Sequence, residues 1–261
     1  MEPNEILWQI KVESVKRLVE SGKRVDDRKF DEFREISVEK DVIVKAEGSA
    51  LVKLGNTTVL VGVKMDVGEP FPDTPEEGVL ITSAELVPLA SPSFEPGPPD
   101  ENSIELARVV DRVIRESKMI DMSKLVIEPG ERVWMVFVDI HVLDCDGNLF
   151  DASTLGAVSA LSCAKIPRYE DGKVIYGEKT KELPIQDLPV SVTFAKINNT
   201  ILLDPNLAEE KAMSARLTVG MTGDKSVCAL QKGGPGYFTY EEICSMLDIA
   251  SEKSEELRKV I

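Results

Sequence analysis

Three arginines spaced along one helix face are the side chains in this sequence best suited to bind an anion. Arg108, Arg112 and Arg115 stand at positions i, i+4 and i+7, so they line up on one side of a helix. Each guanidinium group can hold a phosphate group through two hydrogen bonds, which grips a nucleic-acid backbone without preference for the base. The opposite side of the helix is apolar and is expected to be buried: Leu106, Val109, Val110, Val113 and Ile114.

Ion pairing within the helix is an alternative explanation for the same arginines. Asp111 stands four residues before Arg115, and Arg112 stands four residues before Glu116. Each such pair stabilises a solvated helix by about 0.2–0.5 kcal/mol without any ligand. The spacing alone therefore leaves phosphate binding and simple surface pairing both open.

A stiff loop leads into this helix. Pro96, Pro98 and Pro99 fix their φ angles and remove backbone donors. Asp100 follows them, and its carboxylate is placed to accept a hydrogen bond from the first free amides of the helix, which predicts an N-cap.

Other candidates for chemistry are weak. The single histidine, His141, lies in a strand pattern on the same face as Asp139, which indicates a surface or subunit-contact residue rather than a catalytic base. The glycine-rich run 232–236 lacks the order of a phosphate-binding loop, so we predict a turn there. The acidic run 144–151 has its glycine at the fourth place, whereas a calcium loop has it at the sixth.

The cysteines also give no sign of a metal site. They are widely separated, form no C-x-x-C pair and have no histidine at ligand spacing, which argues against zinc. We expect reduced thiols in a cytosolic protein that uses no metal and no cofactor. The four residues are Cys145, Cys163, Cys228 and Cys244.

The chain has 261 residues, of which 43% are hydrophobic and 30% charged. This is the composition of an ordinary soluble globular protein, and the length is enough to bury a large core. The formal net charge of -15 argues against a free-standing nucleic-acid binder, because phosphate contacts supply most of the affinity of such proteins. Any RNA binding must be local or must depend on a partner, and DNA binding is not expected. No signal-peptide pattern and no run of about 18 apolar residues is found, so we expect a cytoplasmic protein without a membrane span.

Apolar periodicity predicts both helices and strands. An amphipathic helix is expected over residues 4–21, Asp151 is expected to cap a second buried helix, and a capping box of Thr239 and Glu242 opens a last helix. Residues 165–188 are polar and are expected to connect two halves of the fold. Strands are expected at 42–46, 50–54, 57–65, 131–144, 191–197, 200–205, 216–222 and 226–232.

Longer segments resemble one family over nearly the whole chain. They are RVDDRKFDEFR (24–34), AEGSALVKLGNTTVLVGVK (46–64), PDTPEEGVL (72–80), ELVPLASPSFEPGPPDENSIELARVVDR (85–112), KLVIEPGERVW (124–134) and LLDPNLAEEKAMSA (202–215). These segments are similar to the RNase PH family, and EPGPPDENSIELARVVDR resembles its non-catalytic type in the archaeal exosome.

The resemblance implies an α+β architecture, the RNase PH fold, with duplicated sheet-and-helix halves of the ribosomal protein S5 domain 2-like kind and an N-terminal helix. It divides the chain into an N-terminal helical extension (1–30), a first half (31–189) and a second half (190–261). The two halves are expected to form one compact unit.

The resemblance also identifies the positions that an active member needs, because active members use inorganic phosphate to cleave RNA from its 3' end. Where they carry a paired arginine, this chain has Glu101 and Asn102. Where they carry a serine–arginine phosphate cradle, it has Leu149 and Phe150, and neither side chain can bind an anion. The phosphate site is therefore expected to be lost.

Two aspartates six residues apart complete the site of the active type. Alignment on the LDPN run (203–206) places Glu210 and Arg216 at those positions. Glu210 keeps a carboxylate, but Arg216 reverses the charge of its counterpart. We therefore expect no catalytic residue in this chain.

The resemblance implies a non-catalytic ring subunit of the archaeal exosome, a phosphorolytic 3'-to-5' RNA-degrading complex. Its expected partners are a catalytic RNase PH-like subunit in a hetero-hexamer (a trimer of dimers), RNA-binding cap subunits and single-stranded RNA. Arg108, Arg112 and Arg115 would contact RNA beside the partner's active site, although pairing with Asp111 is an alternative explanation for Arg115. Two alternatives stay open: an active exoribonuclease that uses Glu210 or Asp204 as its acid, and an RNA-free scaffold of the ring.

Overall fold

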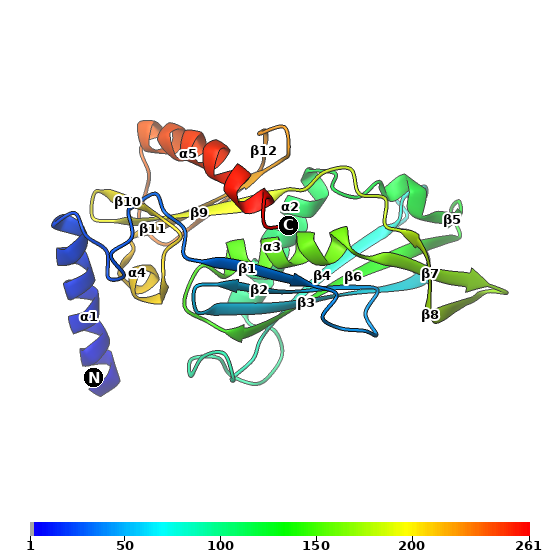
Figure 1. Ribbon diagram of the computed structural model, residues 1–261, viewed down its shortest axis with the longest axis horizontal. Helices are drawn as coiled ribbons and strands as arrows, with labels where there is room; N and C mark the ends of the chain where they lie inside the picture. Colours follow the sequence, from blue (N-terminus) through cyan, green and yellow to red (C-terminus); the bar gives the residue numbers. More distant parts are fainter. Residues whose placement is uncertain (1–2) are drawn as a thin grey trace.

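A six-stranded β-sheet forms one side of the molecule, and the computed structural model describes residues 3–261 (Figure 1). Its strands are β1 (Ile36–Lys40), β2 (Gly48–Leu54), β3 (Thr57–Gly68), β4 (Val79–Leu86), β5 (Val126–Glu128) and β6 (Arg132–Asp144). Their order is β1-β2-β3-β6-β4, and β5 pairs with β6. The β4–β6 pair is parallel, and the other pairs in this sheet are antiparallel.

A second, four-stranded antiparallel sheet has the order β10-β9-β11-β12. Its strands are β9 (Val190–Ile197), β10 (Thr200–Leu203), β11 (Ala215–Met221) and β12 (Val227–Gly233). Every residue of β9 is buried, because helices cover this strand on both faces of the sheet.

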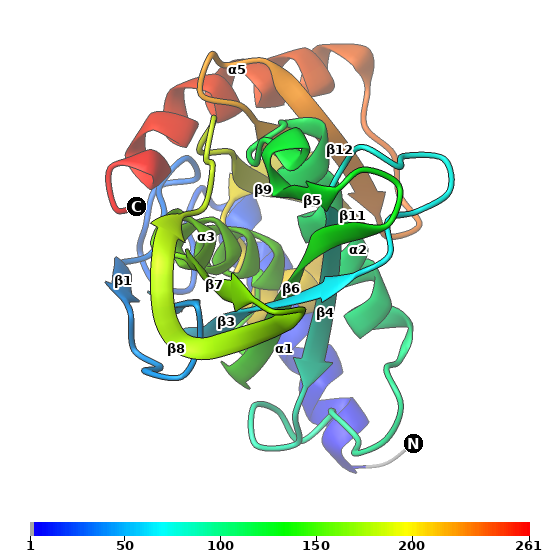
Figure 2. The same ribbon diagram turned by 90° about the vertical axis from the view of Figure 1, so that its right-hand side faces the viewer.

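Two helices lie between the two sheets, and the others pack around the second sheet or against each other. The helices are α1 (Pro3–Glu20), α2 (Glu101–Glu116), α3 (Leu149–Ser162), α4 (Leu207–Ala212) and α5 (Tyr240–Arg258), with a 3₁₀ turn η1 (Met122–Leu125). Helix α2 contacts β4 and β12, and α3 contacts β2, β3 and β9, so both lie between the sheets (Figures 1 and 2). Helix α5 packs on β9 and β11, whereas α1 packs against the short helix α4.

Helix α3 is almost wholly buried because it is enclosed by both sheets. Residues 150–161 are all buried, and small side chains such as Ala152, Ala157 and Ala160 let strands approach closely. At Gly48 of β2 the approach is so close that a Cβ atom would lie 2.3 Å from the carbonyl oxygen of Ala160.

Most of the predicted elements are present, and the N-cap of the arginine helix is confirmed. The Asp100 carboxylate accepts a 2.8 Å hydrogen bond from the amide of Ser103. The capping box of Thr239 and Glu242 is confirmed as well. The expected division at residues 30 and 189 stays a prediction, and residues 1 and 2 of the expected extension lie outside the described residues.

The predicted strand at 42–46 is wrong. These residues form a loop after β1, which itself occupies Ile36–Lys40. The chain turns at Asp41, whose φ is 56°, and the amide of Ile43 bonds to the hydroxyl of Ser49. Val44 is 90% exposed, so β-branched residues alone do not make this segment a strand.

Two further predictions need correction. Helix α3 begins at Leu149 after Asn148, which has a φ of 54°, so Asp151 lies inside the first turn and is not its cap. Residues 165–182 are not a plain connection but a hairpin of β7 (Lys165–Glu170) and β8 (Lys173–Glu182). The hairpin turns at Asp171-Gly172 with positive φ at both residues, a dipeptide that favours such turns.

The close approach of β2 and α3 can be tested by substitution at Gly48. Changing Gly48 to alanine should lower the free energy of unfolding by about 1–3 kcal/mol, because the new methyl group meets the helix backbone and not a flexible side chain. The matched control is Gly62→Ala in the neighbouring strand β3, where a Cβ atom would meet nothing within 4 Å. Denaturant unfolding of both variants checks this, and equal effects would contradict the packing argument.

Candidate functional site

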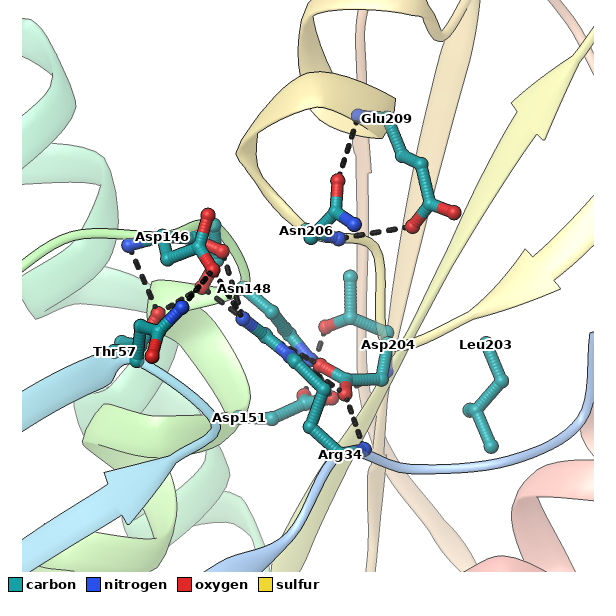
Figure 3. A network of polar contacts seen from close by, with 12 residues as sticks. Arg34, Thr57, Asp146, Asn148, Asp151, Leu203, Asp204, Asn206 and Glu209 are labelled. Carbon is teal, nitrogen blue, oxygen red and sulfur yellow. Dashed lines mark hydrogen bonds and ion pairs between the residues drawn. The ribbon is translucent and has the colours of Figure 1, made fainter. Parts of the chain in front are cut away.

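A buried carboxylate, Asp204, holds the N-terminal segment against the rest of the fold (Figure 3). Its Oδ1 accepts hydrogen bonds of 2.7 Å from Arg34 Nη2 and 2.7 Å from Asn148 Nδ2. Its Oδ2 accepts bonds of 2.9 Å from Arg34 Nε and 2.9 Å from Arg28 Nη1. Burial by itself would raise the pKa of Asp204, but the hydrogen bonds and charge of Arg34 outweigh it and hold the pKa below its ordinary value.

Asn148 extends this network to a second buried carboxylate. Its Nδ2 also donates a 2.8 Å bond to Asp151, which accepts further bonds from Ser191 Oγ and from the amide and hydroxyl of Thr193. Burial raises the pKa of Asp151 to about 7. The side chain therefore ties the first turn of α3 to β9.

A separate buried ion pair fixes α4. Arg24 donates bonds of 2.8 Å and 2.6 Å to the two carboxylate oxygens of Glu209, and both side chains are fully buried. Glu209 also forms the capping box of α4 with Asn206 (Figure 3). No local pattern predicts a role for Arg24, Arg28 or Arg34, although the RVDDRKFDEFR segment contains all three.

Beside this network lies a cavity of about 310 Å³ that brings together most of the positions expected to be degenerate. Glu101 is not among the residues that line it. The five that do are Asn102, Leu149, Phe150, Glu210 and Arg216. The cavity also borders the first turns of α2, through Glu105 and Leu106.

Two cations, Lys211 and Arg216, line this cavity, but the two positions of the expected phosphate cradle are apolar. Leu149 and Phe150 present apolar groups, and Arg216 already has a carboxylate partner, because its Nη2 lies 2.8 Å from Glu105 Oε1. The Arg216 guanidinium also lies over the Phe150 ring, 4.1 Å from its centre. Glu210 accepts a 2.8 Å bond from the amide of Asn148, and burial raises its pKa.

The arginine row on α2 divides into two kinds of residue. Arg115 pairs with Asp111 through two bonds of 3.1 Å, as the i, i+4 spacing suggested, and donates a third bond to the carbonyl of Leu80 in β4. Arg108 and Arg112 are exposed, and neither forms an ion pair or side-chain hydrogen bond with the described part of the chain.

A shallow hollow of about 290 Å³ lies along this helix face. Its lining includes Thr82, Arg108, Arg112 and Arg115. The expected pair between Arg112 and Glu116 is not formed, so simple intrahelical pairing does not account for Arg112.

The remaining candidates stay weak. His141 is a surface residue on the outer face of the first sheet, with its Nδ1 3.3 Å from Glu85. Within residues 3–261 no group of three or more histidine, cysteine or acidic side chains is placed to hold a metal ion. Among those residues, no helix is both long and apolar enough to cross a membrane.

Comparison with known proteins assigns the family. Residues 32–167 match domain 1 of the 3' exoribonuclease (RNase PH) family, and residues 187–253 match its domain 2. The chain belongs to the RNase PH family. The exosome complex component Rrp42 of Methanopyrus kandleri is 54% identical over 260 residues, which cover 98% of this chain and 97% of that protein. The Rrp42 component of Pyrococcus furiosus is 52% identical and covers all of this chain and 96% of its own length.

Solved structures have the same fold. A chain of the Archaeoglobus fulgidus exosome with RNA bound to the active site has a TM-score of 0.92 and 53% identity, covering 97% of this chain and 98% of its own. A chain of an archaeal exosome core has a TM-score of 0.89 and 49% identity, with 98% of both chains covered. Rice Rrp46, at 18% identity and a TM-score of 0.69, shares the fold alone.

We expect the Asp204 network to contribute to the stability of the folded protein. Changing Asp204 to asparagine should lower the free energy of unfolding by about 3–5 kcal/mol, because the guanidinium groups of Arg34 and Arg28 lose their buried anion. The control is Asp146→Asn, a partly exposed carboxylate 3.9 Å from Arg34, for which we expect less than about 1 kcal/mol. Denaturant unfolding at neutral pH distinguishes the two, and equal costs would contradict the assignment.

The pH dependence of unfolding gives a second readout of the same prediction. The folded-state pKa of Asp204 lies below the unfolded value of about 3.9, so its contribution to stability is complete above that pH. The contribution is lost as the pH falls through the folded-state value. Asp204→Asn should therefore be less stable than the natural protein at neutral pH and should lose less stability in acid.

Proposed function

We propose that this chain is a non-catalytic ring subunit of an archaeal-type exosome, a phosphorolytic 3'-to-5' RNA-degrading complex. It alternates with a catalytic RNase PH-like subunit in a hetero-hexamer, under RNA-binding cap subunits, and contributes RNA binding to its partner's active site. The names of its relatives as exosome components support the assembly. The solved relative that holds RNA at an active site supports the substrate.

The observation that carries catalytic silence is the chemistry of the 310 Å³ cavity. Leu149 and Phe150 supply no anion ligand, and the guanidinium of Arg216 is engaged by Glu105 and the Phe150 ring. Phosphorolysis needs a preorganised pocket for the attacking phosphate, and loss of such electrostatic stabilisation removes a large part of catalysis.

The rival view, an active nuclease in its own right, lacks an acid group in the right place. Asp204 is fully buried and neutralised by two guanidinium groups, so it cannot reach a substrate. Glu210 keeps a carboxylate in the cavity, but one of its oxygens is bonded to the amide of Asn148, and the paired aspartate of the active type is Arg216 here.

RNA contact is assigned to Arg108 and Arg112. Both are exposed and free of intrahelical partners among the described residues, whereas a pure scaffold would leave two unpaired cations on a chain of charge -15 without a use. Their spacing along the helix axis is about 6 Å, which suits adjacent phosphates of an extended single strand. Arg115, committed to Asp111 and Leu80, plays a supporting part.

Catalytic silence is tested by incubating the purified chain with single-stranded RNA and inorganic phosphate. We expect no release of nucleoside diphosphates from the chain alone, and release once it is assembled with a catalytic RNase PH-like partner. The partner alone serves as the control. Diphosphate release by the isolated chain, at a rate comparable to the complex, would overturn the assignment.

RNA binding is tested with Arg108→Ala/Arg112→Ala in the assembled complex. Removing two phosphate contacts should weaken single-stranded RNA binding and reduce the slope of log K against log salt by about 1.4. The matched control is Arg132→Ala/Arg168→Ala, which removes the same charge from exposed positions around the β7–β8 hairpin. Fluorescence anisotropy across a salt series measures both, and equal losses in the two variants would favour a scaffold without RNA contact.

A further inference from the structure

An ion pair fastens the beginning of α2 to the second sheet. Glu105 on α2 accepts a 2.8 Å bond from Arg216 Nη2 of β11 and a 2.9 Å bond from Gln231 Nε2 of β12. The Arg216 side chain is 13% exposed and that of Glu105 33%, so the contact is largely shielded from water. It joins one helix to two neighbouring strands.

The strand surface is shaped to receive a guanidinium group at this point. Phe150 presents its ring to Arg216 at 4.1 Å, which favours a planar cation over an ammonium group. Gly233, paired with Arg216 across the sheet, leaves the space that the group occupies, since a Cβ atom there would lie 2.7 Å from Arg216 Nη2. The neighbouring residues Phe150 and Gly233 therefore accommodate an arginine side chain at position 216.

The end of α2 is fastened to the other sheet. Arg115 donates a 3.1 Å bond to the carbonyl of Leu80 in β4 and is steadied by Asp111. Glu105 and Arg115 are ten residues apart, so the two attachments lie about 15 Å apart along the helix. Arg108 and Arg112, the two free cations, stand between them.

Glu105 shares a helix stripe with these cations, since residues 105, 108 and 112 are spaced i, i+3 and i+7. Fixing the backbone under a flexible arginine lowers the ordering cost that binding must overcome. A helix held at both ends would present Arg108 and Arg112 at a constant separation and orientation.

We propose that Arg216 and Glu105 are positioning residues for RNA binding: their ion pair holds α2 so that Arg108 and Arg112 meet the RNA phosphates together. This inference rests on the proposed RNA contact of α2. Arg216 stands where the active type has an aspartate, so the residue that marks the loss of catalysis has a role of its own. Neither Arg216 nor Glu105 touches RNA in this arrangement.

The test compares Glu105→Gln and Arg216→Met in the assembled complex, with a labelled single-stranded oligoadenylate as the probe. If the pair positions α2, both variants weaken RNA binding by roughly fivefold, a modest coupling between sites. If the two side chains act only through their charge, Glu105→Gln removes an anion beside the phosphates and binding becomes tighter. Unchanged or tighter binding by Glu105→Gln overturns the proposal.

Two further measurements separate positioning from general loss of stability. In the Arg108→Ala/Arg112→Ala background neither change should weaken RNA binding further, because the residues through which they act are gone. Hydrogen exchange should show faster exchange of the first amides of α2 in both variants without RNA, while the helix α5 amides keep their rates. If α5 exchanges faster to the same degree, the pair serves folding alone and the proposal fails.

The same design separates this inference from the proposed function. If Arg108→Ala/Arg112→Ala leaves RNA affinity unchanged, the RNA contact itself is wrong, and with it the positioning role. If that variant weakens binding but Glu105→Gln does not, the contact stands and only the positioning role is wrong. Should Arg216→Met fail to assemble, Arg216→Lys keeps the charge but not the planar stacking, and it is expected to weaken binding in the same direction.

Discussion

The fold depends on one buried carboxylate and the cations that neutralise it. Asp204 and Asn148 both have positive φ angles, 49° and 54°, a left-handed conformation that asparagine and aspartate adopt more readily than other non-glycine residues but that still carries some strain. Their side chains bond to each other, and Arg34 and Arg28 complete the shell. The network offsets this strain, and it lies where α3 begins and where the chain turns toward α4.

The buried network and the cavity beside it are built from different side chains. The structural carboxylate, Asp204, is fully buried, whereas the substituted positions line a cavity next to it. Asn148 connects the two, because its side chain bonds to Asp204 and its amide bonds to Glu210. The proposed loss of the phosphate site, through Leu149, Phe150 and Arg216, therefore leaves the buried ion pairs of Asp204 intact.

Local pattern was enough to predict the arginine helix, its Asp100 cap and most strands, since each depends on residues close in sequence. The substituted positions that line the cavity were predicted from the resemblance to the RNase PH family, not from local pattern. The buried arginines were not predictable, because Arg24 and Glu209 are 185 residues apart and no periodicity links them. The false strand at 42–46 and the missed hairpin at 165–182 have a common cause: both segments are largely exposed, so their apolar content does not report a buried face.

The proposed loss of catalysis and the proposed RNA contact are compatible because Arg216 is paired with Glu105. An unpaired Arg216 would attract phosphate. Its guanidinium group beside Glu210 would then partly restore an anion-binding site. Its pairing with Glu105 prevents this, since a partly buried ion pair has little external field at the distance of a ligand. In the proposed function, Arg108 and Arg112 on α2 supply the local positive charge that meets RNA, although the chain as a whole has a net charge of -15.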